Sequence, residues 1–385
     1  MTGIELKGIT WAHRRAVDPL TATLPAFAAR RHNITISWSS RTLHGFEFAP
    51  IEELAALYDL VILDHPFCGD IAATECLLPL DALFDERLAR AFVGPSLESY
   101  RYAGHIWALP VDAACQVAVA RPDLMARLDR ASPRTWDEVL ALGAAAQRHG
   151  MRLAIGLRGV HSLMTFFTLC ANLGRPCGTR PEEPLADRTT ALEALEAMRA
   201  LLAYCPKDVL NWNSIALHDA LAERDDLVFC PAVYCYATYA EADQANPLRF
   251  FDLPGLDGAT PRGSTIGGTG IGISARTADP EAALAYVGFL AEAETQRAFA
   301  MNHGQPARRD VWEADEIDAR FGGCYSATRA TMESAWIRPR YTGYLDFQAK
   351  AGALLEGHLR GDVSEDVLLE RLEALHRAGG GQADR

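Results

Sequence analysis

The first 64 residues alternate between strand-like and helix-like patterns, and this order restricts the possible fold more than any other feature of the chain. Residues 4–9 alternate apolar and polar side chains, as a strand with one buried face does. Asp18 and Pro19 have the N-cap and first-turn signals of a helix. Residues 34–38 alternate again, and residues 60–63 are the short apolar run of a strand buried on both faces. The order strand–helix–strand–helix–strand predicts a parallel sheet with helices on its faces.

Polar and aromatic residues follow the predicted strands at the places where such sheets bind ligands. Ligands of open α/β sheets lie beyond the carboxyl ends of the strands. Trp11 and His13 come after the first strand, and Asp64 and His65 come after the strand at 60–63. We therefore expect these four residues near a ligand cleft.

The middle of the chain continues the alternation and forms a second α/β unit. Thr135 and Glu138 fit a capping box that opens a helix to about His149. The other predicted elements are strands at residues 106–120, 153–157 and 227–236 and a helix at residues 189–202.

The last third opens on a strand and is otherwise helical. Residues 265–274 are glycine-rich with β-branched residues between the glycines, which is typical of a strand that something approaches closely. Asp279 and Pro280 start a long helix. Further helices are expected at residues 322–337 and 345–359, and a final one capped near Asp362 or Ser364.

Composition excludes several function classes. The 385 residues predict two or three domains. A net charge of −13 repels phosphate backbones and anionic lipids, so neither nucleic acid nor a membrane surface is an expected partner. The longest nearly uncharged run, residues 227–240, is too short for a membrane helix and contains Pro231, so no membrane insertion is expected.

The cysteines and the N-terminal residues indicate the cellular compartment in which the protein is expected. Nine cysteines without a CxxC pair make a disulfide framework or a zinc site unexpected, and His65 with Cys68 has no matching second pair of ligands. The first residues lack the basic start and apolar stretch of a secretory signal. As the sequence stands, we expect a reduced, cytoplasmic protein; if a signal segment has been removed, the expected location is periplasmic.

No cofactor or metal is expected either. Gly270-x-Gly272-x-x-Ala275 matches a dinucleotide fingerprint only nominally, because these glycines lie within a strand rather than at a strand-to-helix turn. Close approach of a ligand to the backbone of Gly267, Gly268 and Thr269 is the better interpretation.

Four segments in order resemble the family-1 extracellular solute-binding proteins, the maltodextrin-binding-protein-like receptors of ABC importers. Residues 104–112 (GHIWALPVD) resemble the family's first crossing strand, and residues 133–138 (PRTWDE) its "P-x-T-W-D-E" helix start. Residues 267–274 resemble the return crossing strand and precede GQPAR at 304–308, and Arg338-Pro339 precedes a helix as the family's "R-P" does.

This resemblance implies an α/β, two-lobed periplasmic-binding-protein-like fold with crossing hinge strands and a helical C-terminal region. Lobe one would comprise residues 1–112 and 265–309, and lobe two residues 113–264 and 310–385. It implies hinge bending on a small polar ligand, a carbohydrate or another polyhydroxylated compound, with an ABC permease as partner if the protein is exported. Aromatic faces and a few polar groups would bind that ligand, and the expected residues are Trp11, His13, Asp64, His65, Asp112, Tyr236, Gly268, Thr269 and Tyr341.

A cytoplasmic enzyme on the same fold is the alternative hypothesis. Cys115 follows the crossing strand, and the fold-related enzyme thiaminase I is similar in carrying a nucleophilic cysteine near this position. Asp64, His65 and His13 are the other candidate catalytic groups, since a histidine beside a carboxylate can transfer protons. The binding hypothesis is preferred by analogy with the family. Cys115 itself is expected to be a small buried thiol, because nothing in the sequence shows a lowered thiol pKa.

Overall fold

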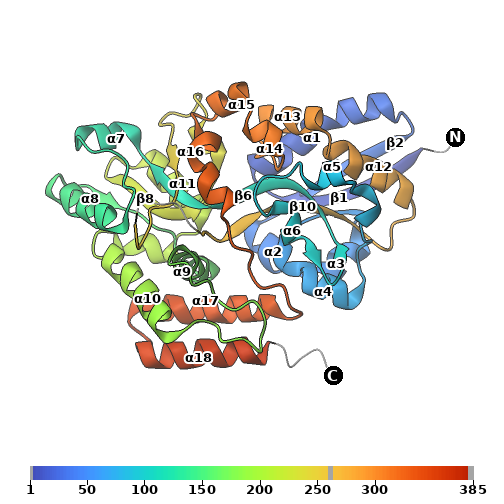
Figure 1. Ribbon diagram of the computed structural model, residues 1–385. Coiled ribbons are helices and arrows are strands. Elements are labelled where there is room, and N and C mark those ends of the chain that lie inside the picture. The colour runs from blue at the N-terminus through green and yellow to red at the C-terminus, as the bar shows by residue number, and fades with distance from the viewer. Residues whose placement is uncertain (1–2, 259–262, 380–385) are drawn as a thin grey trace. The chain divides into compact units, whose positions relative to one another are not determined.

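The chain folds into two compact units, each an α/β structure (Figure 1). The computed structural model describes residues 3–258 and 263–379. Unit 1 comprises Met1–Ala113, Gly267–Ile317 and Arg340–Thr342, and unit 2 comprises Ala114–Ile266, Asp318–Pro339 and Gly343–Arg385. Of the expected lobes, residues 1–2, 259–262 and 380–385 lie outside the described residues.

The sheet of unit 1 has the predicted parallel start. Strand β1 (Ile4–Trp11) pairs in parallel with β2 (Ile34–Arg41) and with β3 (Leu60–Leu63), whose four residues are all buried. Strand β10 (Ile266–Ile273) runs antiparallel to β3, and β6 (Leu109–Ala120) follows it in the sheet. The predicted α/β fold class is confirmed in this part of the chain.

Helices cover both faces of this sheet because successive side chains of a strand point in opposite directions. Trp38 of β2 packs against Tyr286 of α12, with ring centroids 6.3 Å apart. Trp11 of β1 faces the other way and packs against Phe46 of α2, at 5.2 Å. Helices α1, α12 and α13 accordingly lie on one face and α2, α3 and α4 on the other (Figure 1). Their bounds are Arg14–Arg30, Pro280–Leu290 and Ala293–Met301, then Leu43–Phe48, Ile51–Leu57 and Cys68–Thr74.

The first helix begins earlier than its proline signals indicate. His13, not Asp18, is the N-cap of α1, and its Nδ1 accepts a hydrogen bond from the Arg15 amide at 3.1 Å. Pro19 and Pro25 both lie inside the helix. The helix continues through them because Leu20 and Phe27 are buried on its inner face, and tertiary packing outweighs the lost backbone hydrogen bonds.

Two segments expected in the second lobe belong to unit 1. Residues 310–317 are held by Trp312, whose Nε1 donates to the Pro306 carbonyl at 2.7 Å, and by an ion pair between Arg297 and Glu316. Arg340 donates to the carbonyls of Glu98, Ser99 and Arg101. Backbone groups 239 to 242 residues away in the sequence thus decide where residues 340–342 lie.

The smaller elements of unit 1 connect these layers. They are η1 (His65–Phe67), η2 (Asp81–Leu83), α5 (Glu86–Ala89), α6 (Ser96–Ser99), β4 (Arg101–Tyr102), β5 (His105–Ile106) and α14 (Arg309–Trp312). Helix α15 (Asp315–Arg320) contains the boundary between the units.

The sheet of unit 2 is built on the second half of β6. Strands β8 (Leu227–Tyr234) and β9 (Arg249–Phe251) run antiparallel to β6, and β7 (Arg152–Leu153) is parallel to β8. The strand expected at 153–157 is therefore two residues long and ends at Leu153. The capping box is present: Thr135 caps α8 (Trp136–Arg148) by accepting from the Glu138 amide at 3.2 Å.

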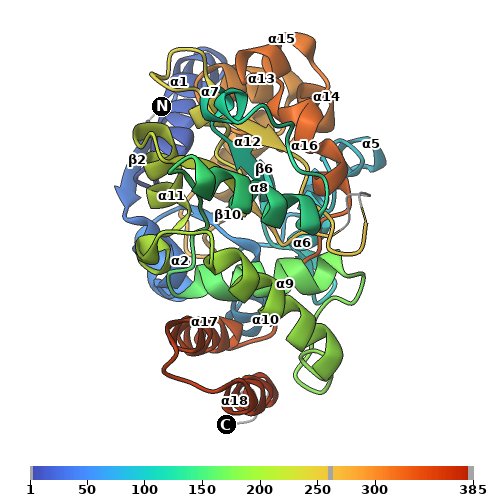
Figure 2. The ribbon, with the colours of Figure 1, turned by 90° about the vertical axis from the view of Figure 1, so that its left-hand side faces the viewer.

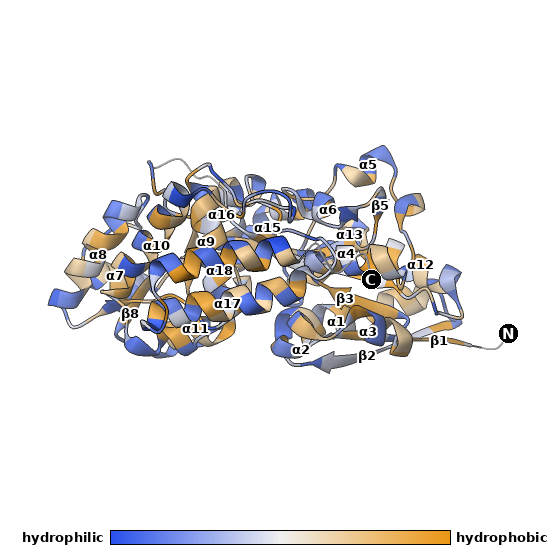
Figure 3. Cartoon of the chain, turned by 90° about the horizontal axis from the view of Figure 1, so that it is seen from below, coloured by the Kyte–Doolittle hydropathy of each residue, from blue (hydrophilic) through white to orange (hydrophobic). Residues whose placement is uncertain are grey.

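One central helix of unit 2 was not predicted. Helix α9 (Val160–Asn172) has all 13 residues buried, so it has no polar face and no amphipathic period to reveal it. Helix α17 (Tyr344–Arg360) packs against α9 and against α18 (Glu365–Ala378), as Figure 2 shows. Hydrophilic and hydrophobic residues alternate along α17 and α18 in Figure 3, and Leu368 and Leu372 of α18 face inward.

The remaining elements of unit 2 are mostly helical. They are α7 (Pro122–Arg127), α10 (Arg188–Leu202), η3 (Lys207–Asn211), α11 (Ser214–Glu223), η4 (Ala237–Ala240) and α16 (Cys324–Glu333). Helix α10 matches the prediction, and α16 is shorter than the expected 322–337. Within the described ranges, no helix combines the length and the apolar run that crossing a bilayer requires.

Candidate ligand-binding site

Five of the expected site residues come together at one edge of the unit 1 sheet. Leu63 pairs with Gly270, so Asp64 and His65, which follow Leu63, lie level with Thr269 and Gly268 on the neighbouring strand. His13 follows β1, and Asp112 lies on β6, next to β10 in the sheet. We call His13, Asp64, His65, Asp112 and Thr269 the edge cluster.

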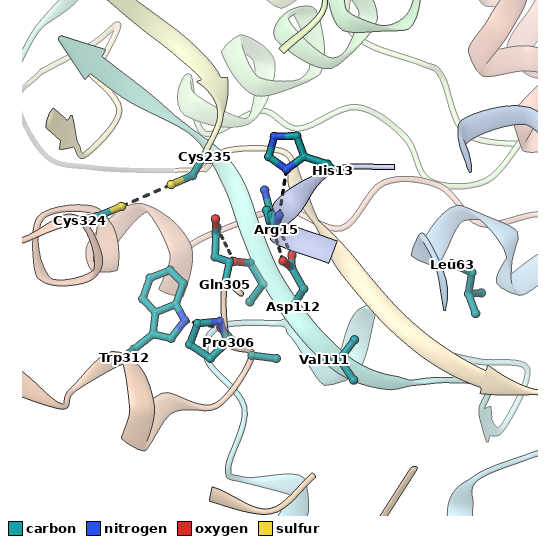
Figure 4. A network of polar contacts seen from close by, with 12 residues as sticks. His13, Arg15, Leu63, Val111, Asp112, Cys235, Gln305, Pro306, Trp312 and Cys324 are labelled. Atoms are coloured by element: carbon teal, nitrogen blue, oxygen red, sulfur yellow. Dashed lines mark hydrogen bonds and ion pairs between the residues drawn. The ribbon is translucent and has the colours of Figure 1, made fainter. Parts of the chain in front are cut away.

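A buried ion pair anchors the edge cluster. Arg15 of α1 donates from Nε to Asp112 Oδ2 at 2.7 Å and from Nη2 to Oδ1, and the two side chains are 4% and 1% exposed (Figure 4). Burial raises the pKa of the Asp112 carboxyl and the Arg15 guanidinium opposes that rise, while the nearby charge of Asp64 adds to it. Both carboxylate oxygens of Asp112 accept hydrogen bonds from Arg15. Asp112 therefore positions Arg15 rather than binding a ligand.

His13 is held neutral. Burial, with the positive charges of Arg15 and Arg14, lowers its pKa to about 4. Since Nδ1 accepts the Arg15 amide hydrogen, the proton of the neutral ring lies on Nε2. The folded protein therefore keeps the His13 ring uncharged at neutral pH.

The lowered pKa of His13 makes unit 1 sensitive to acid. An unfolded histidine has a pKa of about 6.5, so below that pH the unfolded chain binds a proton that the folded chain does not, and stability falls as the pH falls towards 4. Between pH 7 and pH 5, wild type should lose about 2 kcal/mol relative to His13→Asn, which keeps an N-cap acceptor. Urea unfolding at both pH values measures this difference. His32→Asn, at an exposed histidine, should follow wild type; equal pH profiles for all three proteins would contradict the assignment.

Asp64 and His65 form a local pair. Asp64 Oδ1 accepts the His65 amide at 2.8 Å and lies 2.9 Å from His65 Nδ1. The His65 ring is 1% exposed and meets Tyr100 edge to face, whereas the Asp64 side chain is 21% exposed. Asp64 is thus the carboxylate of the edge cluster that remains within reach of a bound molecule.

The glycines of β10 are approached by the chain itself. A Cβ on Gly268, whose φ is +94°, would lie 2.4 Å from the Asp112 carbonyl oxygen. One on Gly270 would meet Ala108 and Tyr100, and one on Gly272 would meet Leu77. Strand β6 therefore makes the close approach that we expected from a ligand at Gly268. The lack of a side chain at this glycine no longer indicates that a ligand lies there.

Thr269 differs from its glycine neighbours. Its side chain is 4% exposed, and its hydroxyl has no hydrogen-bond partner among the described residues. A buried hydroxyl without a partner lowers stability by about 1–3 kcal/mol. The Thr269 hydroxyl is thus a polar group prepared for a partner that the described residues do not supply.

Trp11 and Tyr341 flank the edge cluster within unit 1. Trp11 is 4% exposed, and its indole N–H also lacks a partner among the described residues. Tyr341 lies in the segment that packs on Gly69, where an added Cβ would be 1.9 Å from the Arg340 carbonyl oxygen. Gly69 belongs to α4, which follows His65–Phe67 directly, so this segment is brought to the same edge.

The other two expected residues belong to unit 2. Tyr236 is 6% exposed and packs in an aromatic group with His218, 5.5 Å away, and Tyr239. Cys115 is 1% exposed, and burial together with Cys235 raises its pKa well above the usual thiol value. A thiol that stays protonated is a poor nucleophile, so this environment does not favour the enzyme hypothesis at Cys115.

Sequence reasoning missed the side chains that hold β6. Besides Arg15, Gln305 donates to the Ala113 carbonyl at 2.8 Å and Gln296 to the Val111 carbonyl at 3.3 Å. In unit 2 it missed His161, whose Nδ1 is 3.3 Å from the Ser214 hydroxyl. Gln305 stands in the GQPAR segment, but that segment does not indicate its partner, and the partners of these four residues are 53 to 192 residues away in the sequence. Among the residues that the structure describes, no three His, Cys, Asp or Glu side chains gather in a way that could hold a metal ion.

Solved structures share this fold over nearly the whole chain. The maltose-bound MalE3 of T. maritima is 19% identical, with a TM-score of 0.84 over 98% of this chain and 100% of the other. The GacH receptor of Streptomyces glaucescens, solved unliganded and with acarbose, is 16% identical, with a TM-score of 0.81 over 99% and 100%. A solute-binding protein of Agrobacterium vitis with bound D-mannitol is 15% identical, with a TM-score of 0.79 over 99% of both. These similarities confirm the predicted fold class.

The family is shown by the sequence. Residues 51–320, well over half of the 385 residues, match the family described as bacterial extracellular solute-binding protein. The match agrees with the resemblance found in the four sequence segments. This chain is therefore a member of the bacterial extracellular solute-binding protein family.

Proposed function

We propose that this protein binds a neutral carbohydrate or polyol and performs no chemistry on it. The carrying observation is the edge cluster of unit 1, which contains a neutral histidine, a partly exposed carboxylate and a buried hydroxyl without a protein partner among the described residues. Trp11, the last residue of β1, precedes His13 by two residues. Donors and acceptors beside an aromatic face suit a ligand that presents hydroxyl groups and an apolar ring or chain. Structurally similar proteins have been solved with maltose, ribitol, D-mannitol and tagatose.

Thermal shift against sugars and polyols tests this proposal. A ligand at 100 times its dissociation constant adds about 2.7 kcal/mol of stability and raises the melting temperature accordingly. Monosaccharides, disaccharides and linear polyols form the screen, with amino acids and inorganic anions as other ligand classes. A shift with an anion or amino acid and with no sugar or polyol would overturn the proposal.

Thr269→Val sharpens the test because the proposal predicts opposite effects on stability and binding. Valine has the shape of threonine without the unpaired hydroxyl, so the free protein should become about 1 kcal/mol more stable. Affinity for the identified ligand should fall about tenfold, the equivalent of one lost hydrogen bond. Asp64→Asn should also weaken binding, whereas Asp18→Asn on α1, outside the edge cluster, should change neither quantity. A Thr269→Val protein that is less stable and binds normally would show that the hydroxyl is structural.

We further propose that the two units close on the ligand by bending at short crossing segments. In unit 1, Arg15, Gln296 and Gln305 hold residues 111–113 of β6. In unit 2, the Gln116 amide donates to the Thr265 carbonyl, and Ser264 donates to the Gln116 carbonyl. Bending is then confined to the few residues between these contacts. The radius of gyration from small-angle X-ray scattering should decrease when the ligand identified in the screen is added; an unchanged radius at saturation would contradict closure.

The family supports a proposal about the partner and the compartment. The matched family is described as extracellular, so we propose that the protein works outside the cytoplasm and delivers its ligand to an ABC permease. Cell fractionation tests this: recovery in the envelope or secreted fraction is expected, and recovery in the cytosol alone would contradict it.

A further inference from the structure

Two buried thiols of unit 2 face one another. Cys235 follows β8, and Cys324 is the first residue of α16. Their sulfur atoms are 3.5 Å apart and point toward each other in Figure 4. The residues are 4% and 1% exposed. The pair thus joins the sheet of unit 2 to a helix 89 residues further along the chain.

These sulfur atoms are in non-bonded contact, 3.5 Å apart. A disulfide has an S–S length of about 2.05 Å, and rotation of the two side chains can supply the small remaining approach. We propose that Cys235 and Cys324 are joined by a disulfide when the chain folds under oxidising conditions. Each thiol gives up one proton and the pair gives up two electrons to the disulfide of a small oxidant or an oxidoreductase, which is reduced to two thiols as the Cys235–Cys324 bond forms.

The bond must form during folding rather than afterwards. Exchange requires a thiolate, and in the folded unit burial raises the pKa of Cys324 well above its usual value, with Cys235 and Cys115 adding to the rise. Both sulfurs are also shielded from a soluble oxidant. The redox state of the pair is therefore set while the chain is still open, and the finished fold preserves it.

Cys115 is the competing partner. It lies on β6 opposite Cys235, whose amide donates to its carbonyl at 3.1 Å. The sulfur atoms of Cys235 and Cys324 meet directly, at 3.5 Å. The geometry thus selects Cys324, and peptide mapping after refolding distinguishes the two pairings.

Refolding of the full chain tests the proposal. The protein is unfolded in guanidinium with reductant and refolded either in a glutathione redox buffer or with reductant present. It is then alkylated and digested without reduction. Mass spectrometry should find the peptides of Cys235 and Cys324 linked only after oxidative refolding. Closing a loop of this length should raise the melting temperature by roughly 10 °C over the reduced protein.

Matched controls separate the bond from other effects of oxidation. Cys324→Ala should lose the linkage and the temperature difference, while Cys205→Ala should keep both. The folded, reduced wild type should stay reduced in the same buffer over the same time. Alkylated Cys235 and Cys324 after oxidative refolding, or Cys235 linked to Cys115, would overturn the pairing. If the folded, reduced protein formed the Cys235–Cys324 disulfide as fast as the refolding protein does, the claim that the bond must form during folding would be overturned. The wild-type comparison needs no variant and so remains decisive if Cys324→Ala fails to fold.

Discussion

Replacing Gly268 with alanine is expected to destabilise unit 1 by about 4 kcal/mol, a large effect for the addition of a single methyl group. Two causes add. The φ of +94° at Gly268 is a conformation that residues with a Cβ rarely adopt. The new Cβ would also lie 2.4 Å from the Asp112 carbonyl oxygen and 2.9 Å from the Ala113 Cα, both backbone atoms that cannot move aside as a flexible side chain can.

Gly104→Ala separates the two causes. Gly104 has a φ of +85°, and a Cβ added there would have no neighbouring atom within 4 Å, so alanine suffers the conformational strain alone. We expect a loss of about 1 kcal/mol at Gly104. Guanidinium unfolding of both variants gives the difference, which measures the contact between β10 and β6. Equal losses at the two glycines would show that the close approach to Asp112 is not present in solution.

This glycine also illustrates what a sequence can and cannot predict. The pattern of residues 265–274 correctly predicts a strand in which something approaches the backbone. It does not say what approaches, because the partner strand β6 lies far earlier in the chain, at Leu109–Ala120. We expected a ligand at Gly268, and the structure places Asp112 and Ala113 there.

Local sequence signals predict which helices and strands form better than they predict the residues at which those elements begin and end. The βαβ start and the capping box at Thr135 depend on near neighbours, and both are present. The predicted start of α1 is wrong because His13 caps the helix ahead of the Asp18-Pro19 signal. Helix α9 was missed because a helix buried on all sides has no period to detect.

The candidate site could be predicted only in part. The rule that ligands meet the carboxyl ends of strands singles out His13, Asp64 and His65, which the strand register brings to one edge. Their contact with a ligand stays a prediction. Arg15 has no such signal: an arginine in the first turn of a helix is usually solvated, and its partner Asp112 is 97 residues away. Long-range pairs of this kind depend on the finished fold, so only the structure reveals them.

Removing the guanidinium of Arg15 is the second change with a large expected effect. Arg15→Met leaves the Asp112 carboxylate buried without its counter-ion, and breaking a buried pair in this way lowers stability by about 3–5 kcal/mol. Arg15→Met combined with Asp112→Leu removes both charges and should recover most of that loss, because the desolvation of the ions is removed with them. Urea unfolding at pH 7 compares wild type with both variants.

The control lies on the same helix. Arg30 pairs with Glu292 at 2.6 Å, but the two side chains are 47% and 45% exposed, so Arg30→Met should change stability by less than about 1 kcal/mol.

The pH dependence of the stability of Arg15→Met is a further readout. Without the arginine, burial alone raises the pKa of Asp112, and the folded state then favours the protonated acid more than the unfolded state does. The variant should therefore regain stability relative to wild type as the pH falls from 7 to 5. If Arg15→Met matched Arg30→Met at pH 7 and showed no such recovery, the buried ion pair could not be what anchors the edge cluster.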